Sequence, residues 1–222
     1  MFSGIFAESI VKRAINSKKL ELKLVNLRDF GAGKHKNVDD KPYGKGTGMI
    51  LKVEPTIDAI ESIKTKSYKI LLSASGKKYS QKEAKLLSKK KAITLICGHY
   101  EGVDARVEKL VDNVYSIGDF ILTGGEIGAM VIVDSVTRLI PGVIKKESLK
   151  DESFSQSSNF PLQANNLLEY PQYTRPEKYR NLEVPKILLS GDHNKIAKWQ
   201  KQQSLKRTKK FRPDLIKSKT LK

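Results

Sequence analysis

The sequence has few of the residues that build disulfide frameworks, zinc sites or membrane spans. Its 222 residues include one cysteine, Cys97, and three histidines. A single cysteine excludes an internal disulfide, suits a reducing compartment and, with scattered histidines, cannot form a zinc site. No apolar run approaches the roughly 20 residues of a membrane-spanning helix, and no secretory signal is recognisable. We therefore expect a cytoplasmic protein with no membrane partner.

The common phosphate-binding loops are missing as well. No Gly-x-x-x-x-Gly-Lys-Ser/Thr pattern occurs, and no Gly-x-Gly-x-x-Gly follows a predicted strand. The segment Gly44–Gly48 is rich in glycine but lacks the required spacing and the following helix. We therefore do not expect a P-loop or the usual dinucleotide-binding arrangement.

Acidic residues are scarce relative to basic ones. The chain has 42 Lys and Arg against 24 Asp and Glu, a net charge of +18. Eleven of these basic residues and two acids lie between Asp192 and Lys222, a net of +9, together with Trp199 and Phe211. A field of this sign attracts polyanions, of which nucleic acid is the commonest. A general lysine bias and a solvated helix face remain alternative explanations.

Apolar patterns in the first two thirds of the chain alternate between predicted helices and strands. We expect helices at 8–18, 55–64, 80–90, 103–110 and 126–140, and strands at 20–25, 49–53, 68–73, 92–97, 113–115 and 120–122. Apolar strands that alternate with helices are typical of a parallel sheet covered on both faces. The predicted fold class is therefore α/β.

Two glycine-bearing segments follow or contain predicted strands. They are Cys97–Gly102 and Tyr115–Glu126. In parallel sheets, ligands bind outside the carboxyl ends of the strands, where these segments and Ser73–Gly76 should meet. Glycines allow sharp turns and close approach of the backbone to a ligand. The sequence thus predicts one pocket lined by backbone groups.

Composition divides the chain into three predicted parts. Residues 1–147 form the α/β domain, and 148–166, rich in Ser, Asn and Gln, form a flexible linker. Residues 167–222 form a small, basic, mainly helical domain with a predicted helix near 194–205. The basic domain is the expected site of nucleic-acid binding.

Charged side chains near the glycine segments also have ordinary structural explanations. Glu101, Asp104 and Asp119 could cap a helix or form a turn, and Arg138 could pair with Asp134 one helical turn earlier. Residue patterns alone therefore reach an α/β protein with a backbone-lined pocket and a basic second domain.

Ordered motifs along nearly the whole chain carry a more specific signal. They are Arg28–Phe30, Val38–Gly44, Cys97–Asp104, Ser116–Asp119, Thr123–Glu126, Asp134–Val143, Glu169–Pro176 and Leu189–His193. With these motifs the chain resembles the bacterial tRNA (guanine-N1)-methyltransferases, a knotted family of the SPOUT class. The resemblance implies methyl transfer from S-adenosylmethionine to N1 of the guanosine at tRNA position 37, beside the anticodon. It also implies a deep trefoil knot and a homodimer that completes each active site.

The resemblance assigns the site residues too. Arg138 matches an essential arginine that stabilises charge on guanine O6, and Asp40 matches a tRNA-contacting residue. The family's general base is the aspartate of Glu-Asp-Ser-Phe; here Glu152 occupies that position and Asp151 stays an alternative. Cofactor contacts are implied for Leu72, Ser73, Gly98, Tyr100, Glu101, Ile117, Gly118, Asp119, Phe120, Ile121, Leu122, Gly124 and Gly125.

The chain departs from the family pattern in several places. The family's apolar first strand has no counterpart before Met1, Ala74-Ser75 replaces Pro-Gln, Lys45 replaces a glycine, and the linker 155–166 is longer. The missing strand and Glu152 leave two alternatives open. One is an RNA-binding relative with weak or no turnover, and the other is a knotted methyltransferase acting on ribosomal RNA. A Mg²⁺ requirement is also left open.

Overall fold

The computed structural model describes residues 1–44, 47–149, 152–154 and 167–217. The chain divides into two compact units, Met1–Ile144 and Lys145–Lys222, and each is described by itself. The predicted boundaries at 147 and 166 stay predictions, and most of the predicted linker lies outside the described residues. Over the described ranges, no helix is long and apolar enough to cross a membrane.

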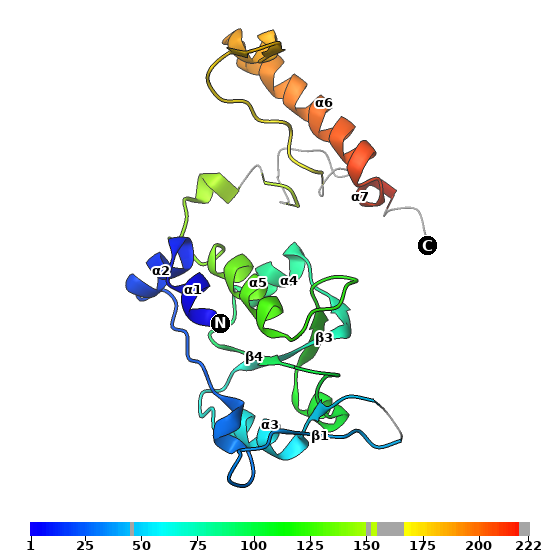
Figure 1. Cartoon of the computed structure of the whole chain (residues 1–222). Coiled ribbons are helices and arrows are strands. Elements are labelled where there is room, and N and C mark those ends of the chain that lie inside the picture. Colours follow the sequence, from blue (N-terminus) through cyan, green and yellow to red (C-terminus); the bar gives the residue numbers. More distant parts are fainter. Residues whose placement is uncertain (45–46, 150–151, 155–166, 218–222) are drawn as a thin grey trace. The chain divides into compact units, whose positions relative to one another are not determined.

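The first unit is a mixed α/β structure (Figure 1). Its elements, with η for 3-10 helices, are α1 (Phe2–Phe6), α2 (Ser9–Asn16), η1 (Leu27–Phe30), β1 (Asp39–Asp40), β2 (Ile50–Leu51), α3 (Val53–Glu61), β3 (Tyr68–Lys78), α4 (Gln81–Leu87), β4 (Ile93–Cys97), η2 (Ala105–Leu110), β5 (Asn113–Ser116) and α5 (Glu126–Thr137). Ser80 begins α4 by accepting a hydrogen bond from the Lys82 N–H, as expected of an N-cap residue.

A parallel sheet with the order β4-β3-β5 forms the centre of this unit. β3 pairs with β4 from Tyr68 opposite Ile93 to Leu72 opposite Cys97. It also pairs with β5, and the register shifts so that both Leu72 and Lys77 lie opposite Tyr115. The parallel α/β arrangement expected from the sequence is confirmed, but β3 runs five residues past its predicted end at Ser73.

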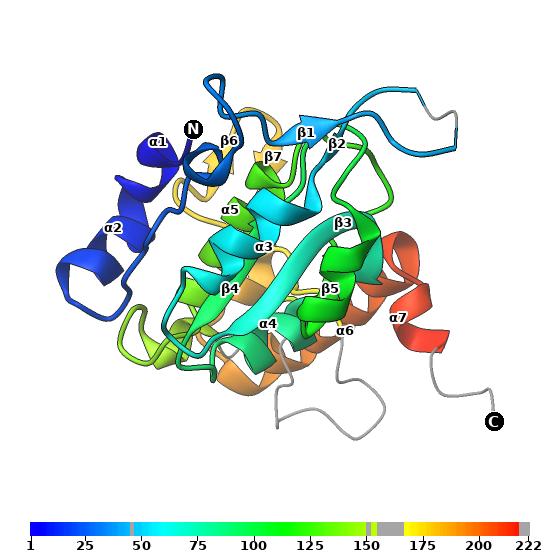
Figure 2. The ribbon, with the colours of Figure 1, turned by 90° about the horizontal axis from the view of Figure 1, so that it is seen from below.

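Successive residues of β3 bury the two faces of the sheet. Ile70 and Leu72 pack with Leu87 of α4 and Ile132 of α5, whereas Leu71 packs with the cluster that contains Ile60 of α3. Figures 1 and 2 show α4 and α5 on one side of the strands and α3 on the other. Side chains alternate across a strand, so an apolar run such as 70–72 is stable only when both faces are covered.

The predicted strands at 20–25 and 120–122 are wrong. Leu20 and Leu22 do pack against the cluster of Phe6, Val11 and Met130, but their extended segment has no neighbouring strand within the described residues. The alternating apolar pattern of this segment therefore reflects packing against helices, and the segment forms no β-ladder within the described residues. Phe120 lies in the bend that follows Gly118, and Ile121 and Leu122 belong to no regular element.

The predicted helices at 103–110 and 126–140 are shortened. The first is the 3-10 helix η2, which starts at Ala105 because the Asp104 carboxylate accepts from the Arg106 N–H at 2.9 Å. The second, α5, ends at Thr137. Beyond it, Leu139 and Ile140 form tighter bonds to carbonyls three residues earlier, before Pro141.

The second unit is built around one long helix. Its elements are η3 (Lys146–Leu149), β6 (Lys178–Tyr179), β7 (Leu182–Glu183), η4 (Lys186–Leu189), α6 (His193–Phe211) and α7 (Asp214–Lys217). The buried hydroxyl of Thr208 accepts from the Leu168 N–H at 2.9 Å, and the Ser204 hydroxyl donates to the Leu168 carbonyl. These bonds fasten the segment after residue 166 along α6, which extends the predicted helix at its carboxyl end.

Candidate functional site

The two glycine segments meet at the carboxyl end of the parallel strands. The Gly125 N–H donates to the Gly98 carbonyl at 2.7 Å, and His99 forms a bridge with Gly124. Gly98 follows β4 directly, so the position of the sheet fixes the position of this first loop. The structure therefore places residues 98–102 beside residues 123–125, as the common sheet edge predicts.

Glycine is required where these loops touch. A Cβ atom on Gly125 would lie 2.9 Å from the Cα of Cys97 and 3.0 Å from the nitrogen of Gly98, both backbone atoms. A Cβ on Gly124 would lie 2.6 Å from the Nδ1 of His99. At position 125 only glycine lets the two backbones approach this closely, whereas at position 124 a Cβ would displace the side chains of His99 and Glu126.

A third segment, residues 48–51, packs against the loop after β4. The Glu101 N–H donates to the Met49 carbonyl at 3.0 Å, and the Leu51 N–H donates to the Gly102 carbonyl at 3.0 Å. A Cβ on Gly48 would lie 2.7 Å from the Cγ of Glu101. The sequence signal was the unexplained glycine run at 44–48, whose final glycine makes room for the Glu101 side chain.

The end of β3 and the loop after β5 lie together on the other side of this edge, and Ser73–Gly76, expected to form a loop there, are part of β3. The Ser116 hydroxyl, in a buried position, donates to the Gly118 carbonyl at 2.9 Å and also accepts from the Gly118 N–H. The Nζ of Lys78 lies 3.2 Å from the carboxylate of Asp119. The two bonds of Ser116 hold the tight turn, after which Phe120 and Ile121 are exposed, Ile121 to 82%.

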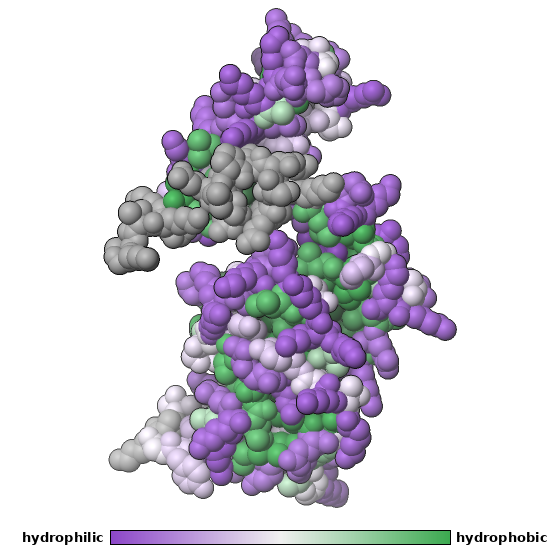
Figure 3. Space-filling model, turned by 180° about the vertical axis from the view of Figure 1, so that it is seen from behind, coloured by the Kyte–Doolittle hydropathy of each residue, from purple (hydrophilic) through white to green (hydrophobic). Residues whose placement is uncertain are grey.

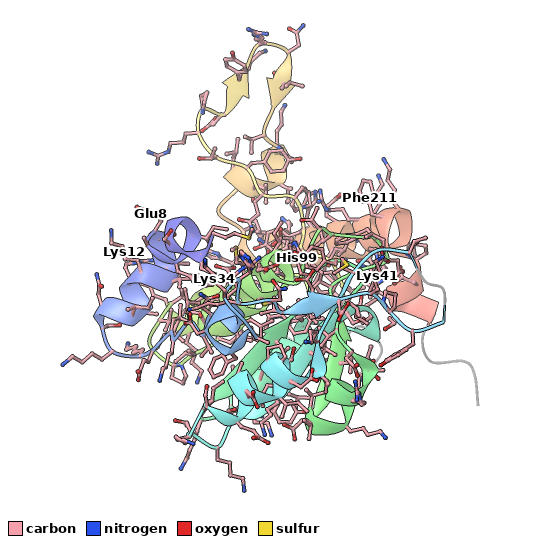
Figure 4. The ribbon with its side chains drawn as sticks, turned by 60° about the horizontal axis from the view of Figure 1, so that its bottom comes forward. Glu8, Lys12, Lys34, Lys41, His99 and Phe211 are labelled. Carbon is pink, nitrogen blue, oxygen red and sulfur yellow. The ribbon has the colours of Figure 1, made fainter. Side chains whose placement is uncertain are left out.

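His99 and Glu126 are not among the site residues predicted from the sequence, where the histidines were considered only as zinc ligands. The Nδ1 of His99 lies 3.8 Å from a carboxylate oxygen of Glu126, and its ring packs edge-on against Tyr100. Figure 4 labels His99 within the first unit. This side-chain contact joins the loop after β4 to the start of α5.

Cys97 lies at the end of β4, directly before this loop. Burial raises the pKa of its thiol to about 12, and the nearby Glu126 carboxylate adds to the effect. The thiol therefore stays protonated and unreactive at neutral pH, since the thiolate is the nucleophilic form. Its place at the sheet edge is explained by packing.

The remaining predicted residues lie on different elements. Asp40 lies in β1, which pairs antiparallel with β2, and Arg138 follows the last residue of α5. Lys34, before β1, and Lys41, directly after it, are exposed (Figure 4). Glu152 belongs to the second unit and is partly buried, whereas Asp151 lies outside the described residues.

Metal-ligating side chains do not gather in the part of the chain that the structure describes. Over those residues, no group of three or more His, Cys, Asp or Glu side chains is arranged to hold a metal ion. The candidate site is therefore a cradle of backbone groups and glycines with Glu101, His99 and Asp119 at its margins.

Comparison with known proteins decides the family. The family model described as tRNA (Guanine-1)-methyltransferase TrmD matches residues 1–218. The chain belongs to this family. Three curated relatives carry the name tRNA (guanine-N(1)-)-methyltransferase. The relative from Caldanaerobacter subterraneus is 50% identical over 100% of this chain and 89% of its own length.

The other two relatives agree closely. The Carboxydothermus hydrogenoformans protein is 52% identical over 98% of this chain and 83% of its own. The Mycoplasmopsis synoviae protein is 49% identical over 97% of this chain and 92% of its own length. The resemblance read from the motifs is thus confirmed. In a methyltransferase family, the glycine-lined sheet edge becomes the candidate site for the methyl donor.

Proposed function

We propose that the protein transfers a methyl group from S-adenosylmethionine to N1 of the guanosine at position 37 of tRNA. The observation that carries this proposal is the family match over residues 1–218. Its structural support is the meeting of the Gly98 and Gly125 backbones at the carboxyl end of a parallel sheet. The lone cysteine and an RNA substrate favour a cytoplasmic location.

The glycine-lined edge fits this cofactor. S-adenosylmethionine supplies an electrophilic methyl group on a sulfonium sulfur when bound. Backbone N–H and C=O groups can hold a ligand without long side chains, and Gly124 and Gly125 let the two loops that carry such groups pack closely at this edge. We assign binding to two residues of β3 and to the loops that follow β4 and β5: Leu72, Ser73, Gly98, Tyr100, Glu101, Ile117, Gly118, Asp119, Phe120, Ile121, Leu122, Gly124 and Gly125.

Two side chains are proposed to act on the guanine. N1 of guanine is a weak acid, so its proton must leave as the methyl group arrives. Glu152 is the proposed general base, with its carboxylate taking that proton. Arg138 is the proposed electrostatic partner of O6, where negative charge develops as N1 is deprotonated. Asp40 is proposed to contact the tRNA, and we assign no role to Mg²⁺.

The helix α6 is proposed to bind the tRNA backbone. Lysines at 195, 198, 206, 209 and 210 are exposed along it. Asp192 caps the helix by accepting from the Lys195 N–H at 3.0 Å, which fixes where the basic face begins. Lysines arranged this way neutralise phosphates and make binding depend on salt.

A homodimer is proposed from the exposed apolar face of α5. Ile127 and Val131, one helical turn apart, are 47% and 44% exposed. Figure 3 shows apolar residues reaching the surface of the first unit between polar ones. Two exposed apolar side chains on one face of a helix are stabilised when that face is covered, which a second copy would do. We also propose the trefoil knot of the family for this unit.

The dimer is tested by placing a charge in the proposed interface. Val131→Glu should convert the dimer to a monomer in sedimentation equilibrium, because an unpaired carboxylate is costly to bury. Leu110→Glu, at a similarly exposed apolar position on η2, should leave the mass unchanged. A monomeric wild-type protein would refute the proposal.

The enzymatic function is tested by methyl transfer to a tRNA transcript with radiolabelled S-adenosylmethionine. We expect turnover by the wild-type protein and loss of at least 100-fold in Glu152→Gln, with tRNA affinity retained. Glu147→Gln, an exposed carboxamide substitution on η3, is the matched control. Tight tRNA binding without any methyl transfer would instead favour the RNA-binding relative.

A further inference from the structure

A second concave site lies on the first unit, near the amino ends of the strands. A cavity of about 320 Å³ is lined by Tyr68, Leu86, Leu87, Lys89, Lys90 and Tyr115. Tyr68 begins β3, and Leu86, Leu87, Lys89 and Lys90 lie at and beyond the carboxyl end of α4. Tyr115 is the lining residue nearest to the glycine loops, because it lies in β5 just before the loop that begins at Ile117. The other five lie at the start of β3, at the end of α4 or just beyond it, and none of them is a residue proposed to bind the methyl donor.

The cavity is lined by both tyrosine rings and lysine side chains. The Nζ of Lys90 lies 4.4 Å from the centre of the Tyr68 ring. The Asn113 side-chain amide donates to the Tyr68 hydroxyl, which holds the ring in place. Tyr115 is buried and packs edge-on against Tyr79 at 5.9 Å, while Leu86 is 52% exposed at the margin. A tyrosine ring held in place and two lysines that line the same cavity suit a ligand that has both a flat ring and a phosphate, and the phosphate would compete with the Tyr68 ring for Lys90.

The pairing of β3 with β4 concentrates positive charge at the same edge. The Tyr68 N–H donates to the Ala92 carbonyl at 3.0 Å, so the segments that precede the two strands lie side by side. These segments carry Lys64, Lys66, Lys89, Lys90 and Lys91. Over the described residues, no ion pair joins any of the five to a carboxylate. Uncompensated lysines around a cavity attract phosphate groups.

We propose that this cavity binds one nucleotide, with its base against Tyr68 and Leu86 and its phosphate on Lys89 and Lys90. The volume lies at the lower end of the about 300–1,000 Å³ typical of ligand sites, which suits one nucleotide rather than a longer segment. The nucleotide is either an unpaired residue of the tRNA or a free mononucleotide. The tRNA source rests on the proposed function, whereas the free nucleotide does not.

Calorimetry with AMP, adenosine and inorganic phosphate tests the site itself. The wild-type protein should bind AMP at least fivefold more tightly than either fragment. Lys89→Gln/Lys90→Gln should weaken AMP binding at least fivefold, and Leu86→Ala, an exposed truncation, about threefold. Lys12→Gln/Lys23→Gln removes the same charge from exposed positions elsewhere on the unit and should change AMP affinity less than twofold.

The salt dependence of tRNA binding then distinguishes the two sources. If the tRNA supplies the nucleotide, Lys89→Gln/Lys90→Gln should reduce the slope of log K against log salt by about 1.5, and the Lys12/Lys23 control by far less. Equal slopes would identify a free mononucleotide as the ligand. The proposal is overturned if AMP binds no more tightly than adenosine, or equally to the wild type and Lys89→Gln/Lys90→Gln. Neither result depends on methyl transfer.

Discussion

The Nδ1 atom of His99 lies 3.8 Å from a carboxylate oxygen of Glu126, and this pair links the first glycine loop to the start of α5. Gly124 packs against the same ring, because a Cβ atom on residue 124 would collide with His99. The same two loops are therefore held together twice, by the backbone hydrogen bond from Gly125 to Gly98 and by the contact between His99 and Glu126. The geometry of the proposed cofactor site depends on both.

Removing the pair should weaken cofactor binding without unfolding the protein. We expect His99→Ala and Glu126→Gln each to reduce the affinity for S-adenosylmethionine about three- to tenfold, because the loop at 98–102 loses one of its ties. The double variant should bind S-adenosylmethionine no more weakly than the weaker-binding single variant, because the two residues are partners in one interaction. Calorimetric titration measures this, with His193→Ala on α6 as the control; additive losses would show that the two residues act separately.

Gly125→Ala should be far more harmful than Gly4→Ala. The Cβ at 125 would press on backbone atoms of Cys97 and Gly98, which cannot move without distorting the sheet, whereas nothing lies within 4 Å of a Cβ at Gly4. Overpacking of this kind costs about 1–3 kcal/mol, and Gly4→Ala in a helix is expected to be neutral or stabilising. Chemical denaturation of both variants checks this. Equal stability would mean that the loops have room to separate.

Cys97 should resist alkylation in the folded protein. With its pKa raised to about 12 by burial, only about one thiol in 10⁴ is ionised at pH 8. Iodoacetamide labelling followed by mass spectrometry should therefore be at least 100-fold slower in the native protein than in 6 M guanidinium chloride. Rapid native labelling would contradict the burial of this residue.

Glu83 should make stability depend on acid pH. Burial alone would raise the pKa of this carboxyl, but hydrogen bonds from Ser80 and Lys77 outweigh it and hold the pKa below 4.5. A lowered folded-state pKa means that the stabilisation is complete above the unfolded value of 4.5 and is lost as the pH falls through the lower folded value. Glu83→Gln should be less stable by about 1 kcal/mol at pH 7. The difference from the wild type should shrink as the pH falls below 4.5; a constant difference from pH 7 to pH 3 would refute the assignment.

The sheet was predictable because its signals are local. An apolar run such as 92–97 followed by glycine can hardly be anything but a buried strand that ends in a turn. The extension of β3 to Lys78 was not predictable, because Ala74–Lys78 is neither apolar nor alternating. Pairing with β5 stabilises it, where a Cβ on Gly76 would lie 2.8 Å from the Tyr115 nitrogen.

The site was predictable only in part for a related reason. Glycines at 98, 124 and 125 mark turns in any sequence, and the sheet edge brings them together. The roles of Gly48 and His99 depend on contacts with residues 53 and 27 positions away along the chain, namely Glu101 and Glu126. Nothing in the local pattern around either residue reports such a partner, so only the folded structure reveals them.

Methyl transfer to a pair of tRNA transcripts that differ at one nucleotide tests the central claim most directly. One transcript carries guanosine at position 37 and the other adenosine, with all else identical. We expect the wild-type protein to methylate the first at N1 of that guanosine, located by nuclease mapping and mass spectrometry, and to leave the second unmodified. Equal methylation of both transcripts, or methylation of neither alongside methylation of ribosomal RNA, would contradict it.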